Sequence, residues 1–531
     1  MDGVPPTNGP GPGHPGGPRT RSEALRRLET TSFDLVVVGG GITGAAIAAE
    51  AAHRGHSVAL LERDDFGCGA SGHTSKLLHG GLRYLAQGHV RLVREALRER
   101  TLVLEEADPS CVRLEPFLLP LRGSAAGVLR DRFGTWLYER LAWGHHLGPR
   151  QVLSRSEVLR RVPALDPEGL RGGVLYWEAI IDDVALTWRR VDSTRREGAV
   201  VVNHAEAVAS ETRSTGGFLV TARDRVGGRD YRIAGRCLVE ATGAWMGRVP
   251  IAPSSPRLAP SKGIHLVLRR ETLPLDLAVV LVGPDGRPTF ALPYGSLVVV
   301  GTTDTAYADD PGAAVSEPSD VDYLLERLRH GFPRLRFDRS SVVDTYAGVR
   351  PLLAAGASHP SELSREDVEV YDPRGAVAVA GGKLTTHRRM AERVLALLPL
   401  PVEARPMPTP PEPSTESRPH RPRTLDTPWA PASELIARLS RSPGPDDWAE
   451  LEKRVTEARD EALTETLEDL LDRRLHALTR REPGFEGVIS KAAELMTRAS
   501  GASPASAESL VASYRAHLAR EHRALEGGDH G

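Results

Sequence analysis

One stretch of this 531-residue chain, residues 33–62, strongly limits how the chain can fold. Residues 33–40 read FDLVVVGG, a continuous apolar run that is typical of a buried parallel strand. A helix of small apolar residues is predicted over 42–54, and Gly55 is a natural end for it. The run HSVALLE at 56–62 predicts a second strand. Together these segments predict a βαβ unit, and therefore a parallel sheet.

A glycine-rich turn joins the first strand to the helix and has the spacing G-x-G-x-x-G. Gly39 permits the tight turn, Gly41 lets a pyrophosphate approach the backbone, and Gly44 lets helix and strand pack closely. The start of the helix then offers unpaired N–H groups and a positive dipole end to phosphates. Glu62, at the end of the second strand, stands where an acceptor for a ribose hydroxyl belongs. The unit predicts a dinucleotide site.

Two segments far downstream indicate FAD rather than NAD. CLVEATGAW at 237–245 predicts a strand that ends in Ala-Thr-Gly, and GAVAVAGGKLTTHRRMAE at 375–392 predicts a strand, a Gly-Gly turn and a helix. A nucleotide domain interrupted by strands of a substrate domain is the layout of FAD oxidoreductases. The helix near Leu384 is expected to aim its positive end at the flavin, where it would stabilise negative charge on the reduced ring.

The rest of the chain divides by composition. The fold class is α/β: a discontinuous Rossmann-like FAD-binding domain, an antiparallel-sheet substrate domain and a C-terminal helical domain. The expected boundaries are a disordered tail at 1–20, an oxidoreductase region at 31–400, a Pro/Arg-rich linker at 404–431 and the helical domain at 432–525. Within the oxidoreductase region we expect FAD-binding parts at about 31–110, 195–250 and 340–400, and substrate parts at about 111–194 and 251–339.

Composition excludes several classes of function. The net charge of −2 provides no chain-wide basic field, so no nucleic-acid partner is expected. The three cysteines are far apart, which argues against a metal site or a disulfide framework and fits a reducing cytosol. No signal peptide and no transmembrane run are visible, so any membrane contact is expected to be peripheral.

The basic residues are unevenly divided, with five lysines and 63 arginines. A general drift from Lys to Arg explains the excess. A lysine that survives such drift then marks a position where a forked guanidinium does not serve. Three of the five, Lys76, Lys262 and Lys383, lie in compact motifs, and we expect a pocket near them.

Six such motifs follow one another along the chain. They are SKLLHGGLRYL (75–85), SKGIHLVL (261–268), FALPYGSLVVVGTTD (290–304), TYAGVRPLL (345–353), LSRED (363–367) and AGGKLTTHRRMAE (380–392). In this order they resemble the FAD-dependent glycerol-3-phosphate dehydrogenase family, a quinone-linked group within the amino-acid-oxidase-like flavoproteins. The resemblance covers about 30–400 and resumes weakly at LTETLEDLLDRR (463–474).

The resemblance implies oxidation of sn-glycerol 3-phosphate to dihydroxyacetone phosphate, with hydride passed to flavin N5 and electrons to a quinone. It also implies a site on the cytoplasmic face of the membrane and a homodimer. Two alternatives stay open: an oxidase that reduces oxygen, and a flavin-binding sensor or scaffold without turnover. The last is disfavoured because Arg83, His265, Arg350, Arg365 and Lys383 are all retained.

Such a reaction needs cations for the phosphate dianion and a base for the hydroxyl. The resemblance places Arg350 close to the reacting hydroxyl, where its charge favours the alkoxide-like form, and His265 is the expected base or orienting residue. Thr302, Thr303 and Asp304 are expected to shape the pocket or support these residues. The substrate-binding set implied by the resemblance is Arg83, Tyr84, Arg365 and Lys383.

Cofactor contacts are expected from the glycine-rich turn and from the motifs that follow it. This set comprises Gly39, Gly41, Ile42, Thr43, Gly44, Glu62, Ser75, Lys76, Gly80, Gly81, Ala241, Thr242, Gly243, Gly382, Leu384 and Thr385. No metal ligands are expected.

Three features depart from the family pattern or are ambiguous. Glu240 and His387 stand where the family usually has Asn and Tyr. The segment 127–143 has apolar residues at helical spacing, with arginines and acids between them. It predicts either a helix packed on the substrate domain or one that lies in the headgroup region of a membrane and admits quinone.

Overall fold

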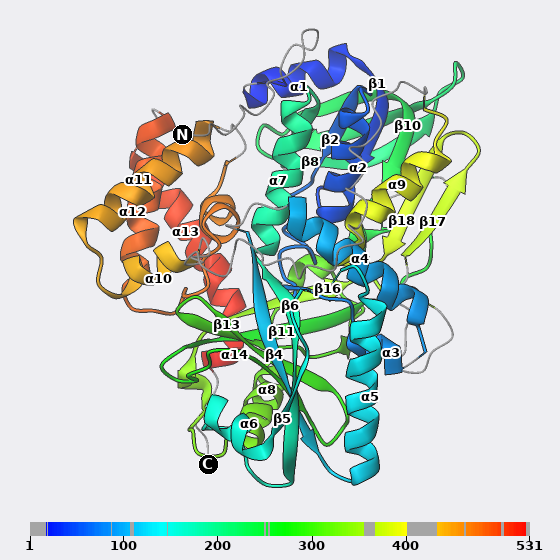
Figure 1. Cartoon of the computed structure of the whole chain (residues 1–531). Helices are drawn as coiled ribbons and strands as arrows, with labels where there is room; N and C mark the ends of the chain where they lie inside the picture. The colour runs from blue at the N-terminus through cyan, green and yellow to red at the C-terminus, as the bar shows by residue number, and fades with distance from the viewer. Residues whose placement is uncertain are drawn as a thin grey trace, which may run out of the picture.

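We examined a computed structural model of the whole chain (Figure 1). The structure describes residues 17–18, 20–86, 88–106, 111–145, 147–248, 251–252, 255–354, 367–400, 433–460, 464–500 and 504–526. The predicted linker at 404–431 and nearly all of the predicted tail lie outside these residues, as does Arg365.

The first of two sheets has eight strands and is built on the βαβ unit. Its parallel part has the order β18-β10-β1-β2-β7, β17 adds an antiparallel edge, and β8 and β9 extend from β10. The strands are β1 (Ser32–Val38), β2 (Val58–Leu61), β7 (Val200–Val202), β8 (Ala205–Thr212), β9 (Phe218–Asp224), β10 (Asp230–Glu240), β17 (Asp367–Asp372) and β18 (Ala376–Gly381).

Apolar side chains bury this sheet on both faces, which explains why the sequence of β1 is a continuous apolar run. Helices α2 (Ile42–His53), α7 (Asp183–Arg196) and α9 (His387–Leu397) pack against one face. Helix α1 (Arg21–Thr30) and the β8–β9 hairpin pack with the other face.

The second sheet has ten strands, all paired antiparallel except β4 with β12. Helices α6 (Arg155–Arg161) and α8 (Pro318–Gly331) cover one face, while α4 (Val90–Glu106) and α5 (Ala125–Leu141) lie on the other side, next to α3 (Leu82–Ala86). The strands are β3 (Leu77–Leu78), β4 (Val112–Arg122), β5 (Gln151–Ser154), β6 (Leu170–Ile181), β11 (Ser261–Arg269), β12 (Ala278–Val282), β13 (Pro288–Tyr294), β14 (Leu297–Gly301), β15 (Thr305–Ala306) and β16 (Val342–Arg350).

The two sheets divide the chain differently from the predicted boundaries at several elements. Strands β3 and β16 were assigned to FAD-binding parts, but they pair with β6 and β11 in the second sheet. Helix α7 was assigned to the substrate part, but it packs on α2 of the first sheet. An apolar pattern reveals that an element is buried, but not which sheet buries it.

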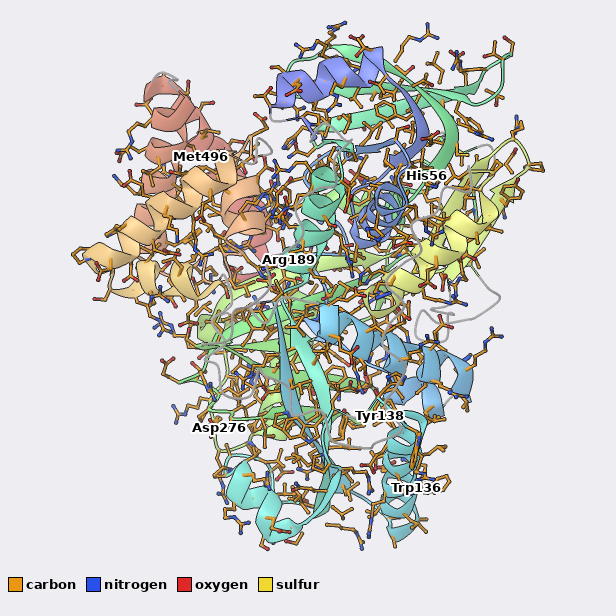
Figure 2. All side chains as sticks on the ribbon, turned by 45° about the horizontal axis from the view of Figure 1, so that its top comes forward. His56, Trp136, Tyr138, Arg189, Asp276 and Met496 are labelled. Carbon is orange, nitrogen blue, oxygen red and sulfur yellow. The ribbon has the colours of Figure 1, made fainter. Side chains whose placement is uncertain are left out.

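Helix α5 has one buried and one exposed side. Tyr138 is buried against the second sheet, whereas Leu129, Phe133 and Trp136 are exposed. Figure 2 labels Trp136 and Tyr138 on this helix. In the described part of the chain, no helix is both long enough and apolar enough to cross a bilayer.

The C-terminal region is helical, as predicted, and lies beside both sheets (Figure 1). It contains a short π-helical turn, η6, and its own apolar core. The elements are α10 (Ser433–Arg441), α11 (Pro445–Asp460), η6 (Asp469–Arg474), α12 (Phe485–Ser500), α13 (Pro504–Glu521) and α14 (Arg523–Glu526).

Candidate active site

A cavity of about 640 Å³ lies where the two sheets meet. Residues at the carboxyl ends of the parallel strands β1, β2, β10 and β18 line it, and β11 and β16 of the second sheet contribute His265 and Arg350. Ligand sites in open α/β sheets lie at the carboxyl ends of parallel strands, so the position fits a nucleotide site.

The glycine-rich turn has no room for side chains. Gly39 has φ +108°, and a Cβ on it would lie 2.4 Å from the carbonyl oxygen of Ala241. A Cβ on Gly44 would lie 1.9 Å from the oxygen of Gly39, so this glycine allows α2 to pack against β1. Gly41 caps α2 without a side chain, and only the hydroxyl of Ser71 accepts from the N–H of Ile42 at 2.9 Å. The positive end of α2 therefore lies at the cavity.

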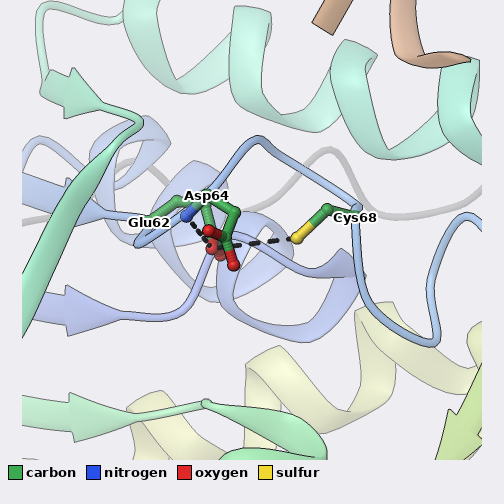
Figure 3. A group of neighbouring side chains, drawn as sticks. All are labelled: Glu62, Asp64 and Cys68. Atoms are coloured by element: carbon green, nitrogen blue, oxygen red, sulfur yellow. Dashed lines mark hydrogen bonds between the residues drawn. The ribbon is translucent and has the colours of Figure 1, made fainter. Parts of the chain in front are cut away.

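Glu62 directly follows β2 and carries a buried carboxylate (Figure 3). Its oxygens accept from the N–H of Gly40 at 2.7 Å and from that of Asp64 at 2.9 Å. Burial, partly offset by these hydrogen bonds, raises the pKa of Glu62 to about 7. Cys68 lies 4.0 Å from Glu62, and burial raises the pKa of its thiol well above the usual value, so it stays protonated and a poor metal ligand. Glu62 is placed as a hydrogen-bond acceptor.

His265 projects from β11 into the wall of the cavity. Its Nε2 lies 2.9 Å from Ser75 Oγ, and its ring stacks on Tyr346 with 4.8 Å between centroids. Its Nδ1 is buried and has no hydrogen-bond partner among the described residues. Burial, and then the charges of Arg350 and Lys76, hold the pKa of His265 well below its usual range. The imidazole is therefore neutral near pH 7.

Arg350 ends β16 and lies across β11. Its Nη2 donates to Thr302 Oγ1 at 2.8 Å and to the oxygen of Thr303 at 3.2 Å, and its Nη1 lies 3.4 Å from Asp304 Oδ1. These three residues thus support Arg350, as the sequence predicted. A Cβ on Gly263 would lie 2.0 Å from Arg350 Nη2, so a glycine leaves the space that the guanidinium fills.

Lys383 and Tyr84 line the same cavity next to each other, and Lys383 contributes a positive charge. The Lys383 ammonium lies 3.8 Å from the centroid of the Tyr84 ring. Lys383 precedes a short 3-10 turn, η5 (Leu384–Thr386), which leads directly into α9. Leu384 and Thr385 also line the cavity, so a second helical start lies there, as the sequence predicted.

Most of the residues expected at the site do line this cavity. They are Gly39, Gly41, Ile42, Thr43, Glu62, Ser75, Tyr84, Ala241, Thr242, Gly243, His265, Arg350, Gly382, Lys383, Leu384 and Thr385. Arg83, Gly80 and Gly81 lie beside the cavity on α3 and the preceding turn and are not part of its lining. Gly44 acts in packing, and Arg365 is outside the described residues.

Two of the three lysines in the motifs are not at the cavity. The Lys76 ammonium is fully buried and lies 2.6 Å from Asp183, and Lys262 lies 2.8 Å from Asp320. The Lys76 side chain therefore does not line the cavity where a flavin or phosphate contact is expected, because it points to Asp183 on the opposite side of the loop from Ser75. Of the three, only Lys383 lines the cavity.

The two departures from the family pattern have simple structural explanations. Glu240 is buried at the cavity, and its carboxylate accepts from Thr242 and Ser255 at 3.1 and 2.8 Å. His387 is buried at the start of α9 and is not part of the cavity lining. Its Nδ1 lies 2.8 Å from the backbone oxygen of Leu384 in the preceding turn.

Sequence reasoning missed lining residues in the loop after β2. His73 is half-buried there, with Nδ1 2.9 Å from the oxygen of Gly69, and the Ser71 hydroxyl accepts from the N–H of Ile42 at the start of α2. Burial, and then nearby positive charges, hold the pKa of His73 well below its usual range. The run of small residues between Glu62 and Ser75 was the available signal, since such a loop lies close to a ligand.

The cavity, the glycine turn, the two helical starts and the acid at Glu62 define an FAD-dependent oxidoreductase. The family model described as "FAD dependent oxidoreductase" matches residues 34–394. The aerobic glycerol-3-phosphate dehydrogenases of Staphylococcus saprophyticus and Staphylococcus aureus (strain USA300) are 36% and 35% identical over 388 and 387 residues, 71% of this chain and 69% of theirs. The chain belongs to the FAD-dependent glycerol-3-phosphate dehydrogenase family.

Solved structures agree on the fold. The FAD complex of the glycerol-3-phosphate dehydrogenase from Bacillus halodurans is similar with a TM-score of 0.70 and 23% identity, over 96% of this chain and 99% of that one. Glycine oxidase from Geobacillus kaustophilus is similar with a TM-score of 0.54 and 22% identity, over 69% and 94%.

Proposed function

We propose that this chain oxidises sn-glycerol 3-phosphate to dihydroxyacetone phosphate and that a quinone takes the electrons. The observation that carries the proposal is a neutral His265 and a cationic Arg350 in one cavity with a dinucleotide turn. When bound, FAD supplies the acceptor for the hydride from C2. Gly39, Gly41, Glu62 and Thr242 would hold it, with the other lining residues of the two helical starts.

In this proposal His265 takes the proton from the C2 hydroxyl, because a neutral imidazole is a competent base. Arg350 stabilises the negative charge that develops on that oxygen, and Thr302 and Thr303 fix the guanidinium. Loss of the proton to His265 and of the C2 hydrogen as hydride leaves the carbonyl of the product.

Lys383 and Tyr84 would bind the phosphate end of the substrate. An ammonium and a phenol supply a charge and a donor for a dianion, and both line the cavity. Arg83 is proposed to assist from α3. Arg365, which lies outside the described residues, is proposed as a further phosphate contact from the family resemblance alone.

The choice of quinone, and a contact with the cytoplasmic membrane surface, is supported by α5. Leu129, Phe133 and Trp136 expose 67%, 57% and 45% of their surfaces, and the two aromatic rings lie 5.5 Å apart. Trp143, 68% exposed, follows the helix beneath the guanidinium of Arg140. Apolar rings bordered by arginines suit the headgroup region of an anionic bilayer, where quinone is dissolved.

Anaerobic mixing of the holoenzyme with sn-glycerol 3-phosphate tests the proposal. We expect the visible flavin absorbance to bleach and to recover quickly with a soluble quinone analogue but slowly in air. Fast recovery in air would identify an oxidase instead. Absence of bleaching would contradict both and favour the flavin-binding scaffold.

A further inference from the structure

The C-terminal helical domain contacts the back of the loop that carries Ser75. His476 follows η6, has φ +49°, and is buried. Its Nε2 lies 3.0 Å from the ammonium of Lys76, and its Nδ1 lies 3.1 Å from Asp182 Oδ1. A residue 400 positions along the chain thus meets the residue next to Ser75.

The buried ammonium of Lys76 makes three hydrogen bonds, one for each of its protons. It donates to Asp183 Oδ1 at 2.6 Å, to the oxygen of Gly72 at 2.9 Å and to His476 Nε2. An ammonium cannot accept, so the proton of His476 is on Nδ1, which lies close to Asp182 Oδ1 without hydrogen-bond geometry. Burial alone would raise the pKa of Asp182, but His476, the N–H of Ala185 and the charge of Lys76 together lower it to about 2. The charge of Lys76 stands where these acids would otherwise attract a metal ion.

The contact between His476 and Lys76 is linked to the cavity by the peptide bond between Lys76 and Ser75. Lys76 has φ +56°, a left-handed conformation that is strained for a residue other than glycine. This conformation sends the Lys76 side chain to the buried side while Ser75 faces the cavity and meets His265. Asp183 also accepts from the N–H and the hydroxyl of Thr74, at 3.0 and 2.7 Å.

Tyr346 connects the same groups from the second sheet. Its hydroxyl donates to the oxygen of Thr74 at 3.0 Å, its ring lies under the Lys76 ammonium, and it stacks on His265. The orientation of the His265 ring is thus fixed by Ser75 and Tyr346, and both depend on the position of Lys76.

We propose that His476 is a positioning residue of the active site: it holds Lys76, and through Lys76 and Ser75 it orients His265. The C-terminal domain would then be part of the catalytic apparatus without lining the cavity. The proposal rests on the role of His265 in the proposed function.

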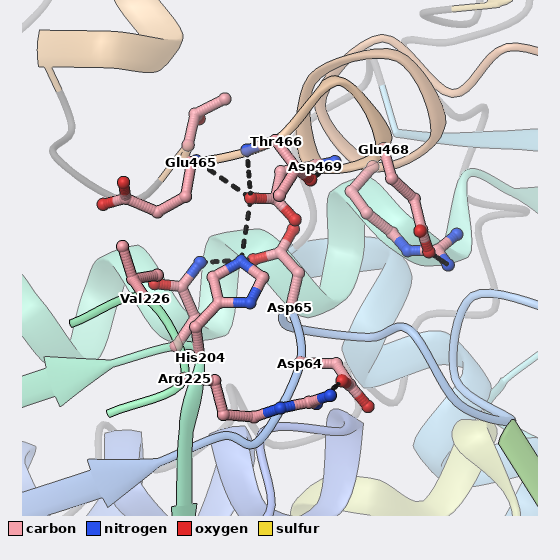
Figure 4. A network of polar contacts seen from close by, with 12 residues as sticks. Asp64, Asp65, His204, Arg225, Val226, Glu465, Thr466, Glu468 and Asp469 are labelled. Atoms are coloured by element: carbon pink, nitrogen blue, oxygen red, sulfur yellow. Dashed lines mark hydrogen bonds and ion pairs between the residues drawn. The ribbon is translucent and has the colours of Figure 1, made fainter. Parts of the chain in front are cut away.

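Two variants separate positioning from domain attachment. His476→Leu removes the acceptor for Lys76 and the close polar contact with Asp182. His204→Leu is a matched control at the same domain interface, since the side chain of His204 lies 2.9 Å from that of Asp469 (Figure 4). Among the described residues it makes no hydrogen bond or ion pair with Lys76 or Ser75. His476→Gln offers an amide oxygen and an N–H in place of the two ring nitrogens, and should rescue.

The readout is anaerobic flavin reduction by the holoenzyme across a pH series, with flavin content and Tm recorded. We expect His476→Leu to lower the limiting rate about tenfold or more with little change in apparent affinity, because a small misplacement of a base is costly. The pH profile of the variant should also change. The pKa of His265 depends on the nearby Arg350, Lys76 and His73, and loss of His476 should move the Lys76 charge. His204→Leu should stay within about twofold and His476→Gln within about threefold. A wild-type rate in His476→Leu, or an equal loss in His204→Leu, would overturn the proposal.

A second measurement does not need the substrate. In holoenzyme labelled with ¹⁵N-histidine, the ring signals of His265 should shift in His476→Leu and remain in place in His204→Leu. If the wild type fails to bleach, the proposed function is wrong, and these spectra alone decide the positioning. Unchanged His265 signals in His476→Leu would refute it.

Discussion

Arg350 influences His265 through charge as well as through the substrate. Burial first, and then Arg350, keep the pKa of His265 below its usual value. The imidazole is therefore neutral over most of the physiological range, and acidification removes the base only when the pH falls through this lowered pKa.

The variant Arg350→Gln should change both rate and pH dependence. Without the guanidinium, flavin reduction at saturating substrate should slow by about 100-fold or more, because an electrostatic stabiliser of the oxyanion is lost. Losing a positive charge also raises the pKa of His265, so the acid limb of the pH profile should move to higher pH. Stopped-flow reduction from pH 5 to 9 measures both. A change in apparent affinity alone, or an acid limb that stays in place, would show that Arg350 only binds.

Lys383 is a position where charge is not sufficient. Its ammonium lies against the Tyr84 ring, and a Cβ built on Gly81 would be 3.2 Å from it. A planar guanidinium needs more room, so Lys383→Arg should lower kcat/KM about tenfold or more although the charge is kept. Steady-state kinetics with a quinone analogue measure this. Lys491→Arg, an exposed lysine in the C-terminal domain, is the control and should leave kinetics unchanged.

The lysine count shows what a sequence can and cannot tell at this scale. The lysines in the motifs do occupy sterically restricted positions, since Lys76 and Lys262 are almost completely buried. The sequence could not show that Lys76 pairs with Asp183 of α7 and Lys262 with Asp320 of α8, because each acid is far from its lysine along the chain. The local sequence pattern predicted that these lysines occupy buried positions, but their acidic partners are known only from the tertiary structure.

Strand β16 is one of the elements through which the C-terminal domain contacts the second sheet. Arg480 donates from Nε to Asp344 Oδ2 at 2.8 Å and from Nη2 to Oδ1 at 3.0 Å. Burial would raise the pKa of Asp344, but Arg480 and His522 outweigh it and lower the pKa to about 2. The same strand ends in Arg350.

Asp344→Asn should destabilise the holoenzyme by about 3–5 kcal/mol, because Arg480 would remain buried with a broken pair. The carboxylate of the wild type stabilises the fold fully above its unfolded pKa of about 3.9, and this contribution is lost as the pH falls toward 2. The variant should therefore lose less stability over this range, as followed by thermal unfolding. Asp230→Asn, which breaks an exposed pair with Arg223, should change Tm little. Equal effects of the two variants would contradict this account.

Elements near the dinucleotide turn were predicted closely, and those between the sheets were not. The segments 33–40, 42–54 and 56–62 correspond to β1, α2 and β2, because a period of 3.6 residues and a buried apolar run are local signals. β16 and α7 were assigned to the wrong sheet, because pairing with β11 or packing on α2 depends on residues distant in sequence. The π-helical turn η6 had no local signal at all.

For the whole molecule, the exposed side of α5 predicts where a membrane would lie. The holoenzyme should sediment with vesicles that contain anionic lipid, and Phe133→Ser with Trp136→Ser should weaken this about tenfold or more through lost apolar burial. Val226→Ser removes an equally exposed apolar side chain from the β9–β10 connection of the first sheet and is the control. Flavin reduction should be unchanged in all variants. Binding unaffected by the α5 changes would place the contact elsewhere.

The distribution of the site along the chain also sets the order of its assembly. The glycine turn at Gly39, the proposed base His265, the cavity lysine Lys383 and the proposed positioning residue His476 leave the ribosome in that order. At roughly 5–20 residues per second, tens of seconds separate the first from the last. A nascent chain would therefore carry a finished βαβ unit long before it can retain its flavin. Cofactor capture is expected to be among the last events in the biosynthesis of this protein.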